Sequence, residues 1–173
     1  PVTAMIRTHL RLALMLAAMA ACVAVGPVGA VAPGDAAPPL ALPDESGATV
    51  SLDALRGRVV YVDFWASWCG PCKRSFPWMG EVQRKYRDRG LTVLAVNVDK
   101  RRSDASKFLA ATPGAFTIVY DPSGSAPSAW DVKGMPTSYL VDRSGRIVSV
   151  ESGFRDESRD DFEARIKAAL DAR

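Results

Sequence analysis

Two cysteines, Cys69 and Cys72, stand three positions apart in the stretch FWASWCGPCKRSFPWM, with Gly70 and Pro71 between them. Such a pair can bind a metal ion, close a structural disulfide or exchange electrons. A zinc site needs about four ligands, whereas the chain has no second cysteine pair and a single histidine, His9. A structural disulfide across so short a loop removes little chain entropy. The spacing therefore favours redox chemistry and predicts neither a metal site nor a cofactor.

The residues around the pair indicate which sulfur reacts first. An apolar run from Arg58 to Trp65 is typical of a strand buried on both faces. A helix is expected to start at Pro71, because the first helical turn tolerates proline. Cys69 then lies at the helix N-terminus, where free N–H groups and the helix dipole stabilise a thiolate. Cys69 is thus predicted to be the nucleophile and Cys72, one turn further on, the resolving thiol.

The remaining pattern predicts an α/β domain with a mixed sheet. Apolar runs bounded by turn residues indicate strands, and apolar residues spaced three to four apart indicate helices. The expected elements are a hairpin over 40–55, strands at 58–65, 91–98, 116–120, 137–141 and 146–150, and helices at 71–89, 103–111, 126–132 and 156–172. Ser103 or Asp104 is expected to cap the second of these helices, and Pro77 to kink the first.

The stretch VDFWASWCGPCK, residues 62–73, resembles the thioredoxin signature. The N-terminal hairpin, the segment 100–131 and the motif GMPTSYLVD at 134–142 resemble the exported TlpA/ResA-like branch of that family more closely, and the likeness covers residues 37–172. The resemblance implies a thioredoxin-like fold, in which helices flank a mixed central sheet that carries an N-terminal β-hairpin and a βα insert. It also implies a thiol:disulfide oxidoreductase that reduces protein disulfides through a mixed disulfide with the enzyme, in cytochrome c or metalloprotein maturation.

The same resemblance assigns a substrate-binding surface. Pro136 matches the family's cis-proline beside the active sulfurs, and the backbone of Met135 would pair with an extended substrate segment as an added strand. Trp68, Gly70 and Pro71, which surround the nucleophile, would line the contact surface. Simple packing stays open as an alternative for Trp68, and an ordinary trans turn for Pro136.

A buried acid is expected beside the cysteines. Asp63 matches the aspartate that assists proton transfer at the buried cysteine of thioredoxins, and burial would raise the pKa of its carboxyl. The chain departs from the family at two places. Ala95 stands where thioredoxins usually have a lysine near this acid, and Ser75 stands where ResA-like members often have a glutamate. A purely structural role for Asp63 therefore stays open.

The first thirty residues have the pattern of an export signal. Met5 is the expected start, followed by the basic residues Arg7 and Arg11, an apolar run over 10–25 and a cleavage site after Ala30. An uncleaved membrane anchor, and a lipoprotein signal that is lipidated at Cys22, stay open as alternatives.

This pattern divides the chain into three parts: a signal peptide over 1–30, a linker over 31–39 and a thioredoxin-like domain over 40–173. It predicts a periplasmic or other extracytoplasmic location, with or without a membrane tether. In such a compartment disulfides persist, so the location is compatible with an oxidised Cys69–Cys72 pair at rest.

Composition narrows the classes of partner. The formal net charge is +3, and it is +1 without the first thirty residues, which contain no acid. A domain this close to neutrality gives no reason to expect nucleic acid, and no pattern indicates self-association, so a monomer is expected. The resemblance implies protein disulfides as substrates and a membrane thiol electron donor of the DsbD/CcdA-like type.

Three alternatives to a disulfide reductase stay open. They are a disulfide oxidase or isomerase, a thioredoxin-fold peroxidase, and a non-enzymatic module that binds copper or protein.

Overall fold

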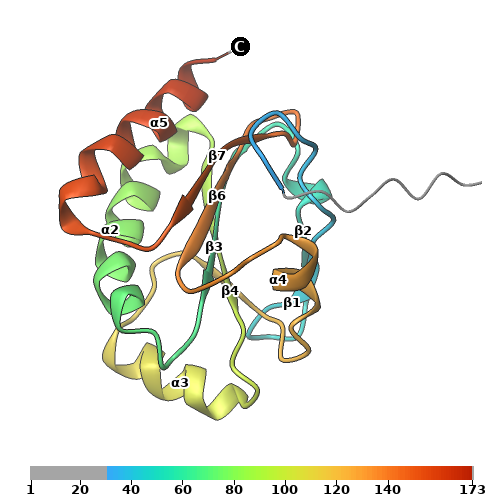
Figure 1. Ribbon diagram of the computed structural model, residues 1–173, viewed down its shortest axis with the longest axis vertical. Coiled ribbons are helices and arrows are strands. Elements are labelled where there is room, and N and C mark those ends of the chain that lie inside the picture. The colour runs from blue at the N-terminus through green and yellow to red at the C-terminus, as the bar shows by residue number, and fades with distance from the viewer. Residues whose placement is uncertain (1–30, 173) are drawn as a thin grey trace, which may run out of the picture.

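The computed structural model describes residues 31–172, which form a five-stranded sheet of order β5-β4-β3-β6-β7 and a separate two-stranded sheet, β1-β2 (Figure 1). The strands are β1 (Ala41–Pro43), β2 (Thr49–Ser51), β3 (Val59–Trp65), β4 (Leu91–Asn97), β5 (Thr117–Tyr120), β6 (Thr137–Val141) and β7 (Ile147–Ser152). The helices are α2 (Gly70–Tyr86), α3 (Arg102–Ala111), α4 (Ser125–Ala129) and α5 (Arg159–Asp171), with short 3-10 turns η1 (Asp53–Leu55), η2 (Arg87–Arg89) and η3 (Asp156–Ser158). The predicted mixed sheet, N-terminal hairpin and insert are confirmed.

The strand before the cysteines is the centre of the sheet. All seven residues of β3 are buried, and β4 and β5 run parallel to it while β6 runs antiparallel. β7 pairs antiparallel with β6 and closes one edge. Strands covered on both faces read as continuous apolar runs, which is why the sequence pattern locates β3 and β4 so closely.

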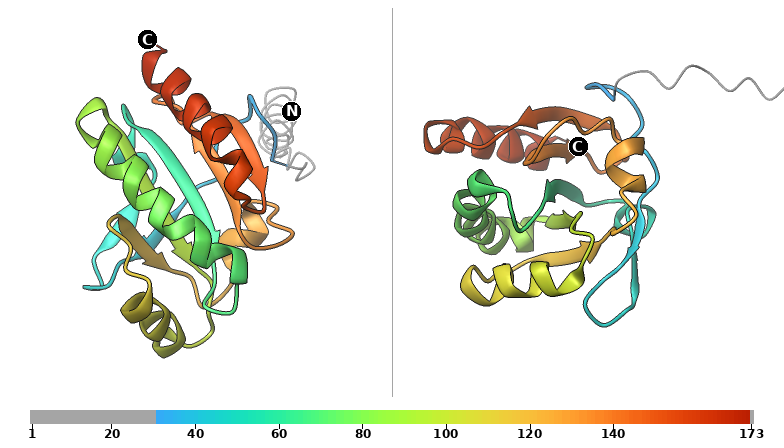
Figure 2. Two further views of the ribbon diagram at one scale, coloured as in Figure 1. Left: turned by 90° about the vertical axis from the view of Figure 1, so that its left-hand side faces the viewer. Right: turned by 60° about the horizontal axis from the view of Figure 1, so that its bottom comes forward.

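Side chains of β3 alternate between two apolar cores. The odd-numbered residues from Val59 to Trp65 pack with α2, α3 and α5, and the even-numbered residues from Val60 to Phe64 pack with the β1–β2 hairpin and α4. Figure 1 shows α2 and α5 on one side of the sheet and α4 on the other, and Figure 2 shows the same layers from two further directions. Asp63 is odd-numbered, so its carboxyl lies on the side of α2.

Helix α2 begins directly at the cysteine pair. Cys69 is its N-cap in an extended conformation, and Pro71 occupies the first turn, where the missing N–H costs nothing. The helix continues through Pro77 to Tyr86, and η2 follows before Gly90 ends the segment in a left-handed conformation with φ of 99°. A residue with a Cβ is strained at such a φ, so glycine suits this turn into β4.

The predicted cap of α3 is wrong. The helix starts at Arg102 with Arg101 as N-cap, and no side chain caps it. The carboxylate of Asp104 instead forms an ion pair with Arg101, 2.9 Å from its Nε. Asp104 is therefore occupied by a charged partner rather than by the backbone N–H groups of the helix end.

Residues 31–39, which composition predicts to be a linker, are joined to the domain by backbone hydrogen bonds. Gly34 N–H donates to the carbonyl of Ile147, and Ile147 N–H donates to the carbonyl of Asp35. Ala37 N–H donates to the carbonyl of Gly145. The segment thus lies along the turn between β6 and β7.

The expected export signal, its cleavage site and Cys22 all lie outside the described residues. Among residues 31–172, no helix has the length and apolar content needed to cross a membrane.

Candidate active site

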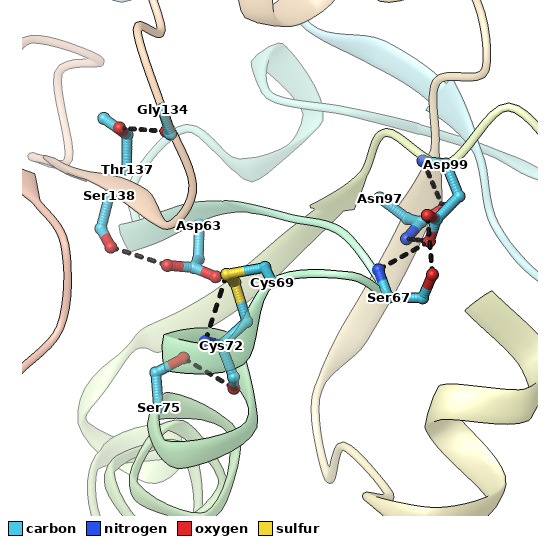
Figure 3. The surroundings of a disulfide bond; sticks show 10 residues. All are labelled: Asp63, Ser67, Cys69, Cys72, Ser75, Asn97, Asp99, Gly134, Thr137 and Ser138. Carbon is cyan, nitrogen blue, oxygen red and sulfur yellow. Dashed lines mark hydrogen bonds between the residues drawn. A yellow bond between two sulfur atoms is a disulfide. The ribbon is translucent and has the colours of Figure 1, made fainter. Parts of the chain in front are cut away.

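Cys69 and Cys72 form a disulfide at the N-terminus of α2 (Figure 3). The backbone N–H of Cys72 donates to Sγ of Cys69 over 3.2 Å. This contact is the one that would stabilise a negative charge on Cys69 after reduction, because a helix N-terminus offers unpaired N–H groups and a positive dipole end. This is the position from which Cys69 is predicted to attack.

Both cysteines rest on an aromatic cluster. Cys69 is 3% exposed and Cys72 is fully buried, within the core that α2 and α3 share with the sheet. The rings of Trp65, Phe76 and Phe108 pack against one another, with centroids 4.8–4.9 Å apart. These rings and the two cysteines belong to the same buried apolar core.

Trp68 presents a different surface from Trp65. Its side chain is 72% exposed, so the alternative that it serves packing alone does not hold. Gly70 is also exposed and Pro71 is half-buried. An exposed tryptophan directly before Cys69 is a large apolar surface beside the disulfide.

The motif expected to face the cysteines lies at the start of β6. The peptide bond between Met135 and Pro136 is cis, as predicted. Thr137 pairs with Phe64 on β3, so Pro136 lies level with the end of the strand that leads to Cys69. Met135 is half-buried and packs against both apolar cores. Phe64 and Thr137, 73 positions apart in sequence, are thereby brought to one end of the sheet.

Asp63 is a buried carboxyl on the disulfide side of β3, 1% exposed (Figure 3). Its Oδ1 accepts a 2.7 Å hydrogen bond from Ser138 Oγ, and its Oδ2 has no partner among the described residues. Burial raises the pKa of Asp63 to about 7, and the bond from Ser138 acts in the opposite direction. Ala95 is its direct neighbour on β4, so no lysine pairs with the acid from that position.

A second buried acid holds the loop between β3 and Cys69, and the sequence analysis did not identify it. Oδ2 of Asp99 accepts from Ser67 N–H at 2.9 Å, and Oδ1 accepts from Ser67 Oγ at 2.9 Å. Asn97 Nδ2 donates to the same carboxylate at 2.8 Å, and Asn97 Oδ1 accepts from Asp99 N–H. Asp99 and Asn97 are both buried. We call Ser67, Asn97 and Asp99 the loop anchor.

The remaining polar group beside the cysteines is Ser75. It is buried, and its Oγ donates to the carbonyl of Cys72 within the helix. Within residues 31–172, no three histidine, cysteine or carboxylate side chains come together as a metal site would require. The chemistry that the described side chains themselves offer is that of two thiols and a buried carboxyl.

Comparison with known proteins places this arrangement in a family. The Redoxin family matches residues 32–166. The thiol-disulfide oxidoreductase ResA of Bacillus subtilis is 32% identical over 128 residues, which cover 74% of this chain and 72% of ResA. ResA of Geobacillus thermodenitrificans is 36% identical over 124 residues, which cover 72% of this chain and 71% of that protein.

Solved structures agree with these relatives. A thiol:disulfide interchange protein of Chlorobium tepidum, described as DsbE, is 50% identical with a TM-score of 0.79, over 82% of this chain and 99% of that one. A structure from Bacteroides thetaiotaomicron, described as a protein disulfide isomerase, is 25% identical with a TM-score of 0.75, over 82% of this chain and 92% of that one. With its Cys69–Cys72 pair, the chain belongs to the Redoxin family, among the ResA-like thiol-disulfide oxidoreductases.

Proposed function

We propose that the protein is an exported reductase of protein disulfides. One observation carries the proposal: Cys69 caps the N-terminus of α2 and accepts the N–H of Cys72, which is the setting that stabilises an attacking thiolate. The two residues between the cysteines, Gly70 and Pro71, are those of general thioredoxins, whose couple lies at about −270 mV. A couple near that potential can donate electrons to strained or exposed protein disulfides, whose potentials are higher than those of structural disulfides.

The reaction follows from the positions of the two sulfurs. The Cys69 thiolate attacks one sulfur of the substrate disulfide, and the other substrate sulfur leaves as a thiolate that takes up a proton. Cys72, as thiolate, then attacks Sγ of Cys69 and releases the second substrate sulfur. The substrate gains two electrons and two protons, and the enzyme is left with the Cys69–Cys72 disulfide.

Asp63 serves the second step in this proposal. Cys72 is buried, and burial in apolar surroundings disfavours its thiolate. A carboxyl with a pKa of about 7 can accept the Cys72 proton near neutral pH and return it later. Ser138 supplies the polar partner that Ala95 does not, so the acid works without a lysine.

The substrate contacts the end of the sheet where these groups meet. Trp68 provides the exposed apolar contact. Gly70 and Pro71, which follow Cys69, place no long side chain next to its sulfur. The backbone of Met135, before Pro136, pairs with an extended substrate segment as an added strand.

The setting of this reaction also belongs to the proposal. The N-terminal pattern supports export to the periplasm or another extracytoplasmic compartment, with or without a membrane tether, and a monomer suffices for the chemistry. A membrane thiol donor of the DsbD/CcdA-like type returns the enzyme to its dithiol form. The resemblance to TlpA/ResA-like proteins supports apocytochrome c or another metalloprotein as substrate.

The redox potential of the Cys69–Cys72 couple tests the direction. We would equilibrate the protein in thiol/disulfide buffers and follow tryptophan fluorescence, since Trp65 packs in the core of the cysteines and Trp68 precedes Cys69. A potential near −270 mV, with reduction of insulin disulfides by the pre-reduced protein, supports a reductase. A potential near −120 mV would instead make it an oxidant.

A further inference from the structure

A cleft of about 500 Å³ is lined by residues that flank the cysteine pair at the start of α2 and by residues of α3. Ser67, two residues before Cys69, and Lys73, directly after Cys72, line one side. Lys107 and Phe108 of α3 line the other. Figure 1 shows α3 lying below the first turn of α2. A substrate chain that extends from the Cys69 sulfur in this direction would enter the cleft.

The cleft is cationic although the chain as a whole is near neutral. Lys73 and Lys107 are exposed on its two sides, and neither forms an ion pair within residues 31–172. Asp104 also lines the cleft, but its carboxylate is paired with Arg101. The lysine ammonium groups are therefore free to meet a negatively charged partner.

The other charges near the cleft do not cancel the positive charge of Lys73 and Lys107. Asp99 lies beneath Ser67, but it is buried and its oxygens accept three hydrogen bonds from Ser67 and Asn97. Arg101, the N-cap of α3, pairs with Asp104. The exposed Lys100 and Arg102 donate to the carbonyls of Pro122 and Glu45, which do not line the cleft. Basic groups thus outnumber acids along this side of the active site.

We propose that this cleft selects substrates whose target cysteine is flanked by acidic residues. Lys73 and Lys107 bind the carboxylates, and the ring of Phe108 at the base offers apolar contact to their methylene groups. The inference rests on the proposed reductase function and names its substrate class. Complementary charge acts mainly on the rate of association. The preference should therefore appear in the association rate constant and decrease as the salt concentration rises.

Three peptides of one length test the preference, each with the same internal disulfide flanked by Asp and Glu, by Asn and Gln, or by Lys and Arg. The pre-reduced protein is mixed with each peptide, and the second-order rate constant of a single turnover is followed by tryptophan fluorescence. At low salt we expect the acidic peptide to react at least about tenfold faster than the basic one, with a smaller ratio at high salt.

The variant Lys73→Ala/Lys107→Ala tests whether the cleft causes the preference for the acidic peptide. It is expected to lose most of the difference between the peptides while changing the neutral peptide's rate by less than about twofold, since both lysines are exposed. Arg84→Ala/Lys167→Ala is the matched control. It removes two exposed charges, and Arg84 lies about 18 Å further along α2 than Cys72. This control should keep the full preference.

Two failures can be told apart. Equal rates for the three peptides, or a preference that survives in Lys73→Ala/Lys107→Ala, would overturn the proposal that the cleft selects acidic substrates. Either result would leave the proposed reductase function intact. If the pre-reduced protein reduces none of the peptides, the proposed direction is wrong. The oxidised protein is then mixed with the dithiol forms of the same peptides, and the same ranking of rates is required.

Discussion

Ser138 on β6 lies directly opposite Asp63 on β3, and its Oγ donates a 2.7 Å hydrogen bond to Oδ1 of the buried carboxyl. On the other side of Asp63, β4 offers only the methyl group of Ala95. Burial disfavours the carboxylate, whereas the hydroxyl of Ser138 favours it. The balance between these two effects sets the protonation of the acid near the pH at which it would work.

Removal of the Ser138 hydroxyl should raise the pKa of Asp63 above its value of about 7. In Ser138→Ala the carboxylate loses its polar partner, so the rate at which Cys72 resolves a mixed disulfide should reach its plateau at a higher pH. The pH profile of that step, measured by rapid quenching, provides the readout. Ser138→Thr keeps a hydroxyl and should behave like the unmodified chain. An unchanged profile in Ser138→Ala would exclude Asp63 as the base for this step.

Asp63 should also make the oxidised protein less stable as the pH rises. Its folded pKa of about 7 lies above the unfolded value of 3.8, so between these pH values the folded state holds a proton that the unfolded state has lost. The free energy of unfolding should fall by about 3 kcal/mol from pH 4 to pH 7 through this group. Urea unfolding of the unmodified chain and of Asp63→Asn measures the difference. A pH dependence that is the same in both would contradict the assignment.

Much of the fold could be predicted because apolar runs mark the central strands directly. β3 is buried throughout and β4 is buried at all positions but Thr92, and α2 starts at a cysteine pair that encloses Pro71, so pattern and structure agree there. The bond between Ser138 and Asp63 could not be predicted, because it depends on the pairing register of two strands 75 residues apart. A one-residue shift in that register would turn Ser138 to the opposite face.

Two expectations from the sequence were wrong, those for the linker and for the cap of α3, and a third feature, Asp99, was not identified. Residues 31–39 are rich in alanine and proline, yet their backbone pairs with the β6–β7 turn, and backbone pairing does not depend on side-chain type. Asp104 follows the pattern of a helix cap, but a nearby Arg101 forms an ion pair with its carboxylate. Asp99 follows a strand as many surface acids do, and only the folded chain shows that Ser67 lies beside it.

The loop anchor should matter for the active site as well as for stability. Asp99→Ala leaves the N–H and hydroxyl of Ser67 without their acceptor and should lower the free energy of unfolding by about 1–3 kcal/mol. Because Ser67 is two residues from Cys69, the rate of substrate reduction should fall too. Asp121 is the matched control. It is also a buried acid after a parallel strand, but it accepts from Ser123, Gly124 and Ala126.

Asp121→Ala should lose a similar amount of stability without changing the redox potential or the reduction rate of the folded protein. Kinetics at a temperature where both variants remain folded separates the two effects. If Asp99→Ala and Asp121→Ala alter the active site equally little, Asp99 serves stability alone.

Trp68 should contribute to substrate binding and hardly at all to stability. Its side chain is 72% exposed, so Trp68→Ala should change the free energy of unfolding by less than about 0.5 kcal/mol. If the ring anchors a partner, the loss of about 1.4 kcal/mol of contact would slow the reduction of a protein disulfide about tenfold. Reduction of a small disulfide such as oxidised glutathione should be much less affected. Equal effects on both substrates would point to the chemistry of Cys69 rather than to docking.

The two cysteines should fail in different ways when each is replaced. Cys69→Ser removes the attacking sulfur at the helix N-terminus and should abolish reduction without any covalent product. Cys72→Ser leaves that sulfur in place but removes the thiol that would release the substrate, so a mixed disulfide with Cys69 should accumulate. Non-reducing gels and mass spectrometry after incubation with an oxidised protein would detect the adduct. Accumulation in Cys69→Ser instead would reverse the roles, and it would mean that the buried Cys72, whose sulfur has no exposed surface, reaches the substrate first.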